Sequence, residues 1–118
     1  MHEKAKGWRR LVAATKYSWC GLVSGWKSEA AIRQEVILLA VGVPLAFWLD
    51  VGRLETVALI MSLVLVFVVE LLNSGIEAVV DRIGSERHEL SGKAKDLGSA
   101  AVLVSLLGAV FTWLMILV

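Results

Sequence analysis

The chain has 118 residues, enough for one domain but too few for two independent domains. Apolar residues make up 58% of it and charged residues only 19%, with a formal net charge of +1. Soluble domains average about 45–50% apolar and about 25% charged residues. These values exclude a disordered tail, an electrostatic nucleic-acid binder and a disulfide scaffold, since Cys20 is the only cysteine. We therefore expect an all-α integral membrane protein, with residues 1–118 forming a single domain.

The first expected element is an amphipathic helix over about residues 6–27. Its apolar residues recur at i, i+3, i+4 and i+7 from Trp8 to Trp26 and fall within an arc of about 120°. Basic residues, among them Arg9 and Lys27, project from the other side. A basic face opposite a Trp-rich face predicts a helix that lies in the cytoplasmic membrane interface. A soluble helix packed against a partner is the alternative.

Three membrane spans are expected after this helix, over about residues 30–49, 54–83 and 94–118. Each supplies the roughly 20 mostly apolar residues that cross about 30 Å of hydrocarbon. Lys and Arg residues gather before the first span and in the expected loop 81–96, whereas only Arg53 lies between the first two spans. The positive-inside rule then places the N-terminus and the 81–96 loop in the cytoplasm and the C-terminus outside.

Polar residues recur within the second span at helical spacing. Glu70, Asn73, Ser74, Glu77 and Asp81 lie at i, i+3, i+4, i+7 and i+11, which stacks them along one helix face. A carboxylate inside a span costs several kcal/mol, so it indicates a functional site by default.

The depth of two carboxylates follows from the helical rise. Glu70 lies about 21 Å along the helix from Thr56, just inside the cytoplasmic boundary of the hydrocarbon, and Glu77 lies about 10 Å further, near headgroups and water. An apolar setting suits Glu70 to the role of general base. A hydrated setting suits Glu77 to a hard divalent cation.

Charged and polar residues also mark the cytoplasmic ends of the other spans. Mg²⁺ is held by one or two carboxylates together with phosphate oxygens and water, so Glu29, Glu77 and Asp96 are candidate ligands. Lys95, and Arg10 from the interfacial helix, could neutralise phosphate charge. The residues at these span ends are Glu29, Arg33 and Glu35 before the first span, and Lys93, Lys95, Asp96 and Ser99 before the third.

The residue pattern leaves three interpretations open. The intramembrane carboxylates could serve a membrane phosphotransferase, bind a proton or cation in a small transporter, or form a structural polar cluster that holds the helices together. Neither a Walker motif nor the H-R-D and D-F-G kinase signatures occur in the sequence, so motifs alone do not indicate ATP use.

Specific segments resemble the bacterial integral-membrane diacylglycerol kinase family. The resemblance rests on an E-x-x-N-[ST]-x-I-E pattern from Glu70 to Glu77, followed by Asp81, and on the Ala94-Lys95-Asp96 triplet. It covers the chain from about Trp8 to the C-terminus, including the segments 17–35 and 48–50. The undecaprenol kinase of Gram-positive bacteria is the related alternative, but residues 33–35, 84–86 and 88–92 are more similar to the diacylglycerol enzyme.

The resemblance implies an enzyme of the bacterial cytoplasmic membrane. Its expected reaction is transfer of a phosphoryl group from ATP to diacylglycerol, yielding phosphatidic acid, with Mg²⁺ as cofactor. The expected assembly is a homotrimeric helical bundle with three spans and one surface helix per subunit, and with active sites shared between neighbouring subunits.

The resemblance also implies residue roles. Glu70 matches the catalytic base that takes the proton of the lipid hydroxyl, Glu29 and Glu77 match the magnesium ligands, and Asn73 lies beside the reacting centre. The implied ATP contacts are Arg10, Tyr17, Glu29, Glu77, Glu86, Arg87, His88, Lys95 and Asp96. The implied lipid contacts are Arg10, Ala14, Thr15, Lys16, Tyr17, Ser18, Trp19, Ala31, Ile32, Arg33, Gln34, Glu35, Trp48, Glu70 and Ser99.

Overall fold

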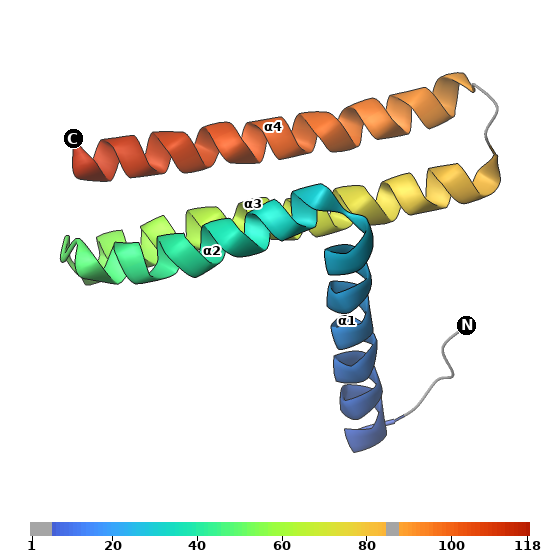
Figure 1. Ribbon diagram of the computed structural model, residues 1–118, viewed down its shortest axis with the longest axis horizontal. Helices are drawn as coiled ribbons and strands as arrows, with labels where there is room; N and C mark the ends of the chain where they lie inside the picture. The colour runs from blue at the N-terminus through green and yellow to red at the C-terminus, as the bar shows by residue number, and fades with distance from the viewer. Residues whose placement is uncertain (1–5, 85–87) are drawn as a thin grey trace.

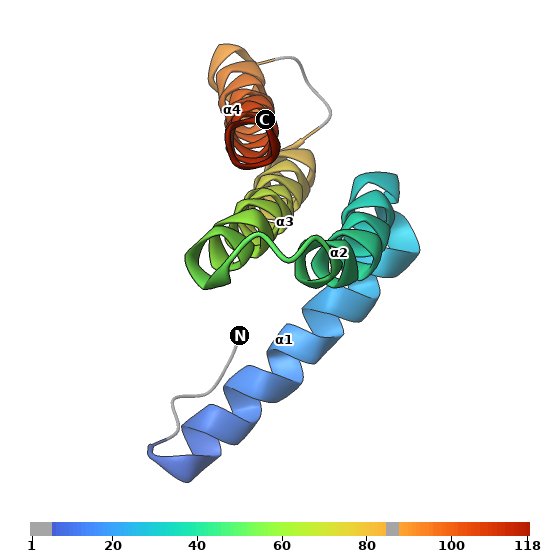
Figure 2. The ribbon, with the colours of Figure 1, turned by 90° about the vertical axis from the view of Figure 1, so that its left-hand side faces the viewer.

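The computed structural model describes residues 6–84 and 88–118 and places them in four α-helices. These are α1 (Trp8–Ser28), α2 (Ala30–Trp48), α3 (Arg53–Ile83) and α4 (Glu89–Leu117). Helices α2, α3 and α4 lie alongside one another, and α1 projects away from them (Figure 1). The end view shows α3 between α2 and α4 (Figure 2), and α3 packs against both, whereas α1 packs against α2. The all-α prediction is confirmed.

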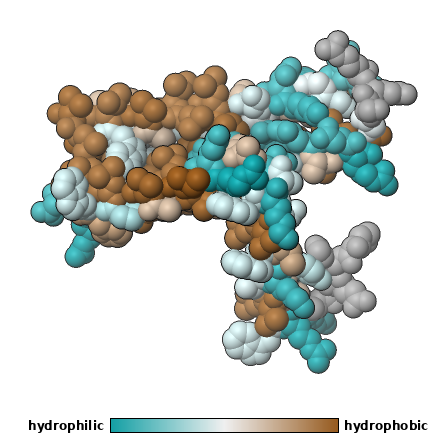
Figure 3. Space-filling view, in the orientation of Figure 1, coloured by the Kyte–Doolittle hydropathy of each residue, from teal (hydrophilic) through white to brown (hydrophobic). Residues whose placement is uncertain are grey.

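Three of these helices are long and apolar enough to cross a membrane, in agreement with the three predicted spans. They are α2, α3 and α4, with 19, 31 and 29 residues. At 1.5 Å per residue α3 is about 46 Å long, more than the roughly 30 Å of hydrocarbon in a bilayer. In Figure 3, apolar surface covers the part of the bundle away from the α3–α4 connection, polar surface gathers near that connection, and α1 shows both apolar and polar surface. The excess length of α3 therefore lies toward the α3–α4 connection.

The prediction of a loop over residues 81–96 is wrong. Helix α3 continues to Ile83 and α4 begins at Glu89, so Lys93, Lys95 and Asp96 lie on a helix. The charges of this segment favoured a turn, but His88 caps α4 by accepting a hydrogen bond at Nδ1 from the Leu90 amide (3.1 Å). Such a cap satisfies one of the free amides at a helix start, and Glu89 complements the helix dipole there.

One face of α3 forms the core, and this face changes from apolar to polar along the helix. Leu59, Leu63 and Val66 are buried at intervals of three and four residues, and the same face continues to Glu70 and Asn73, which are also buried. The core face of α3 is therefore apolar toward its start and polar toward its end.

Small residues let α4 approach this face closely. The buried positions of α4 are Gly98, Ser105 and Ala109, and small residues at such contacts are typical of helix pairs in membranes. Near the C-terminal end of α4, Trp113 Nε1 donates to the Leu59 carbonyl oxygen (3.2 Å) and to Ser62 Oγ (3.1 Å). These bonds fix the register of α4 on α3.

The corner between α1 and α2 is closed by an arginine. Arg33 Nη1 donates to the carbonyl oxygens of Trp26 (2.7 Å) and Lys27 (3.3 Å), which lie in the last turn of α1. Ile32, with 1% of its surface exposed, packs against Gly25. Carbonyls at the end of a helix lack intrahelical partners, so Arg33 satisfies them and holds the corner at Glu29.

Candidate functional site

The candidate site is built on a row of polar side chains along the second half of α3. Glu70 and Asn73 are only 7% and 8% exposed, Glu77 is partly exposed, and Asp81 is exposed. The row therefore leads from the buried core to the surface at the end of the molecule where α3 connects to α4. The polar face predicted from the spacing is present.

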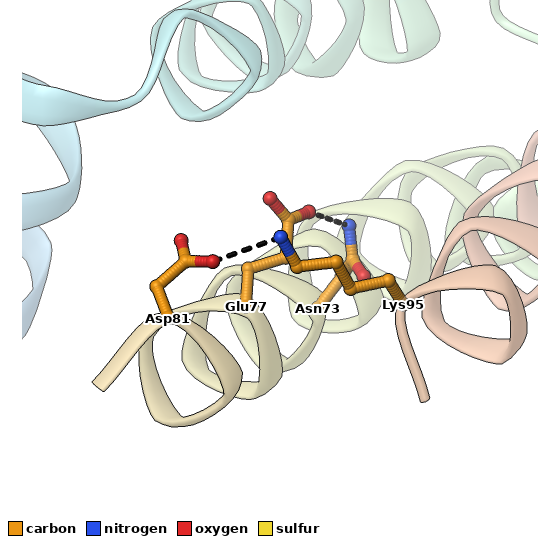
Figure 4. A network of polar contacts seen from close by, with 4 residues as sticks. All are labelled: Asn73, Glu77, Asp81 and Lys95. Atoms are coloured by element: carbon orange, nitrogen blue, oxygen red, sulfur yellow. Dashed lines mark hydrogen bonds and ion pairs between the residues drawn. The ribbon is translucent and has the colours of Figure 1, made fainter. Parts of the chain in front are cut away.

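Asn73 connects the buried and the exposed ends of this row. Its Nδ2 donates a hydrogen bond to Glu77 Oε1 at 2.9 Å (Figure 4), and no other described residue hydrogen-bonds to the second oxygen of Glu77. Among the described side chains, Asn73 Oδ1 and Glu35 Oε2 are buried without a hydrogen-bond partner. Buried polar atoms are normally hydrogen-bonded, so these two oxygens mark the part of the molecule where a polar partner would fit.

Helix α4 brings a cation to the exposed end of the row. Lys95 Nζ lies 2.8 Å from Asp81 Oδ1, and both side chains are well exposed, at 45% and 66% (Figure 4). An ion pair this exposed adds little to stability. Its effect is on position: it holds the Lys95 ammonium near Glu77, with which it interacts electrostatically.

Carboxylates from three parts of the chain gather around Glu70. Glu77 on α3, Glu29 at the α1–α2 corner and Glu35 on α2 are each close enough to interact electrostatically with Glu70. Like charges at such a spacing repel one another in a medium of low dielectric constant. This cluster is therefore suited to a partner that carries positive charge.

The carboxylates fit Mg²⁺ only together with a second source of oxygen ligands. Among the described residues, no three His, Cys, Asp or Glu side chains are placed to hold a metal ion by themselves. Mg²⁺ commonly takes one or two protein carboxylates and completes its shell with phosphate oxygens and water. Glu29 and the free oxygen of Glu77 match that donor set if a nucleotide supplies the phosphates.

An open groove lies beside this cluster. It has a volume of about 660 Å³ and is lined by α1, α2 and α3, with Ser18, Glu29, Ile32, Phe67 and Ser74 among its residues. Several lining positions are small, which keeps the groove open between the helices. It joins the corner carboxylate Glu29 to two of the residues assigned to lipid contact, Ser18 and Ile32.

The structure does not bring every predicted site residue to this cluster. Trp48 ends α2 at the opposite end from Glu29, and Arg10 lies near the start of α1, about 28 Å along the helix from Glu29. The Thr15 and Ser18 hydroxyls donate to the carbonyl oxygens of Leu11 (2.9 Å) and Ala14 (2.8 Å) in their own helix.

The remaining predicted residues lie on exposed or peripheral surface, or outside the described residues. Glu86 and Arg87 lie outside them, and His88 is the cap of α4. Six further residues are exposed on their helices: Ala14, Lys16, Tyr17 and Trp19 on α1, and Asp96 and Ser99 on α4. Along α2, Gln34 is exposed, and Ala31 and Arg33 are partly exposed.

Sequence reasoning assigned no site role to two residues that the structure places in the cluster. Asp81 belongs to the predicted polar face, but its ion pair with Lys95 was not predicted, because the predicted loop over residues 81–96 did not place Lys95 on a helix beside α3. Gly98 carries no chemical signal in the sequence beyond being a glycine inside an apolar segment.

Comparison with known proteins gives a consistent family assignment. Residues 16–117 match the family description "Prokaryotic diacylglycerol kinase". The chain is 54% identical over 117 residues to the diacylglycerol kinase of Escherichia coli K12, covering 99% of this chain and 96% of that protein. It is 50% identical over 111 residues to the diacylglycerol kinase of Pseudomonas aeruginosa (94% and 90% covered). It is 48% identical over 110 residues to that of Haemophilus influenzae (93% of each chain covered).

Proposed function

The chain belongs to the prokaryotic diacylglycerol kinase family, and on this premise we propose that it transfers the γ-phosphoryl group of ATP to diacylglycerol, yielding phosphatidic acid. One observation carries the proposal. A buried carboxylate, Glu70, lies on the same helix face as the hydrogen-bonded Asn73–Glu77 pair, and that face leads out to Lys95 at the surface. This order suits a lipid hydroxyl at the buried end and phosphates at the exposed end.

The proposed location is the bacterial cytoplasmic membrane. Helices α2, α3 and α4 cross it, and α1 lies in its cytoplasmic interface. The large apolar side chains of α1 support this placement, because Trp8, Leu11, Val12 and Trp19 are more than half exposed in the chain alone. With the basic residues gathered before α2 and near the α3–α4 connection, the N-terminus is cytoplasmic and the C-terminus lies outside.

In the proposed reaction, Glu70 acts as general base. Its carboxylate takes the proton of the diacylglycerol hydroxyl as that oxygen bonds to the γ-phosphorus. The bond between the γ-phosphorus and the β,γ-bridging oxygen breaks in line, and ADP leaves with the bonding electron pair. No covalent enzyme intermediate is required, so the protein contributes positioning, a base and neutralisation of charge.

The charged end of the row would hold the nucleotide. Glu29 and Glu77 are the proposed ligands of Mg²⁺, which when bound neutralises charge on the phosphates. Asn73 orients the Glu77 carboxylate through its hydrogen bond, and Lys95 offers an ammonium to the phosphates. Arg10, Tyr17, Glu86, Arg87, His88 and Asp96 are the further proposed nucleotide contacts.

The diacylglycerol would occupy the groove between α1, α2 and α3. The groove is open and Glu29 lines it, so acyl chains could lie along it. Glu70 is buried beside the groove and does not line it, so in this proposal the hydroxyl extends past Glu29 toward Glu70. Residues 14–19 of α1, residues 31–35 of α2, Trp48 and Ser99 are the proposed lipid contacts.

We further propose a homotrimer with shared sites. Helix α1 projects away from the other three helices (Figure 1), and Arg10, near its start, lies about 28 Å along the helix from Glu29. In this proposal Arg10 therefore serves the nucleotide at the site of a neighbouring subunit.

The test is a radiolabelled-ATP assay on the purified protein in mixed detergent–lipid micelles with Mg²⁺. We expect label in phosphatidic acid when diacylglycerol is present, and about 10²- to 10⁴-fold slower labelling by the Glu70→Gln variant. Undecaprenol is the second acceptor: preferential labelling of undecaprenol would identify the related polyprenol kinase activity. A proton- or cation-coupled transporter predicts ion flux in sealed vesicles without ATP consumption, and that result would reject the kinase proposal.

A further inference from the structure

Gly98 of α4 lies directly against the side chain of Asn73. Gly98 is buried, and a Cβ built on it would overlap Asn73 Oδ1 and would lie 3.2 Å from Asn73 Cγ. The other described glycines of α4 are different, because a Cβ at Gly92 or Gly108 meets nothing within 4 Å. A glycine inside a helix costs about 1 kcal/mol relative to alanine, and at Gly98 a larger residue would require the Asn73 side chain to shift.

The contact fixes the orientation of the Asn73 amide. The oxygen of the amide is buried facing α4 without a hydrogen-bond partner among the described residues, while its nitrogen donates to Glu77 Oε1 at 2.9 Å. A side chain at position 98 would push the amide oxygen away from α4. The amide would then rotate or shift, and the nitrogen would lose its alignment with Glu77.

The same approach of the two helices places Lys95. Lys95 lies one turn before Gly98 on α4, and its ammonium reaches Asp81, two turns beyond Asn73 on α3. A wider α3–α4 separation at Gly98 would therefore disturb both the carboxylate of Glu77 and the cation opposite it.

We propose that Gly98 is a positioning residue for the metal–nucleotide site: by admitting the Asn73 amide between α3 and α4, it holds the Glu77 carboxylate in the orientation that binds the cation. This inference rests on the proposed function, because it takes Glu77 to be a ligand of the metal–nucleotide complex. Groups that orient a metal ligand typically contribute 10- to 100-fold to metal affinity. Gly98 would act through Asn73 and would touch neither substrate.

The experiment compares Gly98→Ala with Gly108→Ala, which adds the same methyl group to the same helix in open space. The first readout is the affinity for Mn²⁺ in the presence of a non-hydrolysable ATP analogue. Electron paramagnetic resonance measures this binding on the detergent-solubilised protein without lipid substrate. We expect Gly98→Ala to weaken Mn²⁺ binding by about tenfold and Gly108→Ala to leave it within about twofold of wild type. Unchanged Mn²⁺ binding by folded Gly98→Ala would overturn the proposal.

A double-mutant cycle with Asn73→Ala separates the positioning role from a general packing effect. If Gly98 acts through the amide, Gly98→Ala adds no further loss of Mn²⁺ affinity in the Asn73→Ala background. An equal loss in both backgrounds would refute the mechanism. If Gly98→Ala alone fails to assemble, the double variant should assemble as Asn73→Ala does, because the smaller side chain leaves room for the new methyl group. If Asn73→Ala assembles but the double variant does not, the mechanism is also refuted.

These outcomes are distinct from failure of the proposed function. If the wild-type protein binds the Mn²⁺–nucleotide complex but phosphorylates no diacylglycerol, the kinase proposal is rejected. The Mn²⁺ affinities of Gly98→Ala and wild type can still be compared in that case. A wild-type protein that is an active kinase, with Gly98→Ala equal to it in Mn²⁺ binding, would reject the Gly98 proposal alone.

Discussion

Replacing Glu70 by glutamine tests the assignment of the catalytic base with little change of shape. The side chain is 7% exposed and lies on the packed face of α3, so an isosteric substitution keeps the packing. Glutamine cannot take a proton from a lipid hydroxyl. General-base catalysis contributes typically 10²- to 10⁴-fold, so we expect kcat to fall by about that factor, equivalent to about 3–5 kcal/mol of transition-state stabilisation.

The same substitution should not weaken the folded protein. Glu70 experiences the charges of Glu77, Glu29 and Glu35, and removing one of several neighbouring carboxylates relieves their repulsion. We therefore expect the thermal midpoint of Glu70→Gln in detergent to equal or exceed that of wild type.

The assay measures initial phosphatidic acid formation at saturating ATP and diacylglycerol, with assembly checked by size-exclusion chromatography. Glu55→Gln is the matched control, because Glu55 is an exposed carboxylate in the first turn of the same helix. Turnover of Glu70→Gln within about threefold of the control would refute the base assignment. A loss of activity that parallels a loss of assembly would refute the packing argument.

Three further predictions follow from the contacts of α3 with its neighbours. Glu77→Gln should require about tenfold more Mg²⁺ for half-maximal turnover, and a magnesium titration that superimposes on that of wild type would exclude ligation. Asp81→Asn should raise the KM for ATP about two- to fivefold with kcat unchanged. It should leave the free energy of unfolding nearly unchanged, because the Lys95–Asp81 pair is exposed. A KM equal to wild type would show that the pair does not position Lys95. Trp113→Phe removes the indole donor to Leu59 and Ser62 far from the site, so it should cost about 1 kcal/mol of stability and lower the thermal midpoint at unchanged kcat; a midpoint equal to wild type would show that these bonds do not hold α4.

Features that depend on local patterns were predictable. The helices and the three spans follow from apolar run length and from the 3.6-residue period. The row from Glu70 to Asp81 follows from spacing along one helix. The same local reasoning failed over residues 81–96. The charged side chains there predict a loop, but α4 begins at Glu89 with His88 as its cap.

Features that depend on which helix faces pack against each other were not predictable from the sequence. The contact of Gly98 with Asn73 requires the rotation of α4 about its axis, and that rotation is set by packing against α3 and by the bonds of Trp113. A pattern within one segment carries no information about it. Arg33 illustrates the same limit: the family resemblance implies a lipid contact for it, which stays a prediction, whereas its guanidinium closes the α1–α2 corner.

The α1–α2 corner determines which end of the helix bundle adjusts to a change in bilayer thickness. If α1 lies in the interface, the Arg33 bonds to Trp26 and Lys27 tie Glu29 to the level of the headgroups, whatever the length of the helices beyond it. A change in hydrocarbon thickness is then accommodated at the other end of the bundle, at the α2–α3 connection and the C-terminus. The proposed nucleotide site would then keep a constant height above the lipid hydroxyls in membranes of different composition.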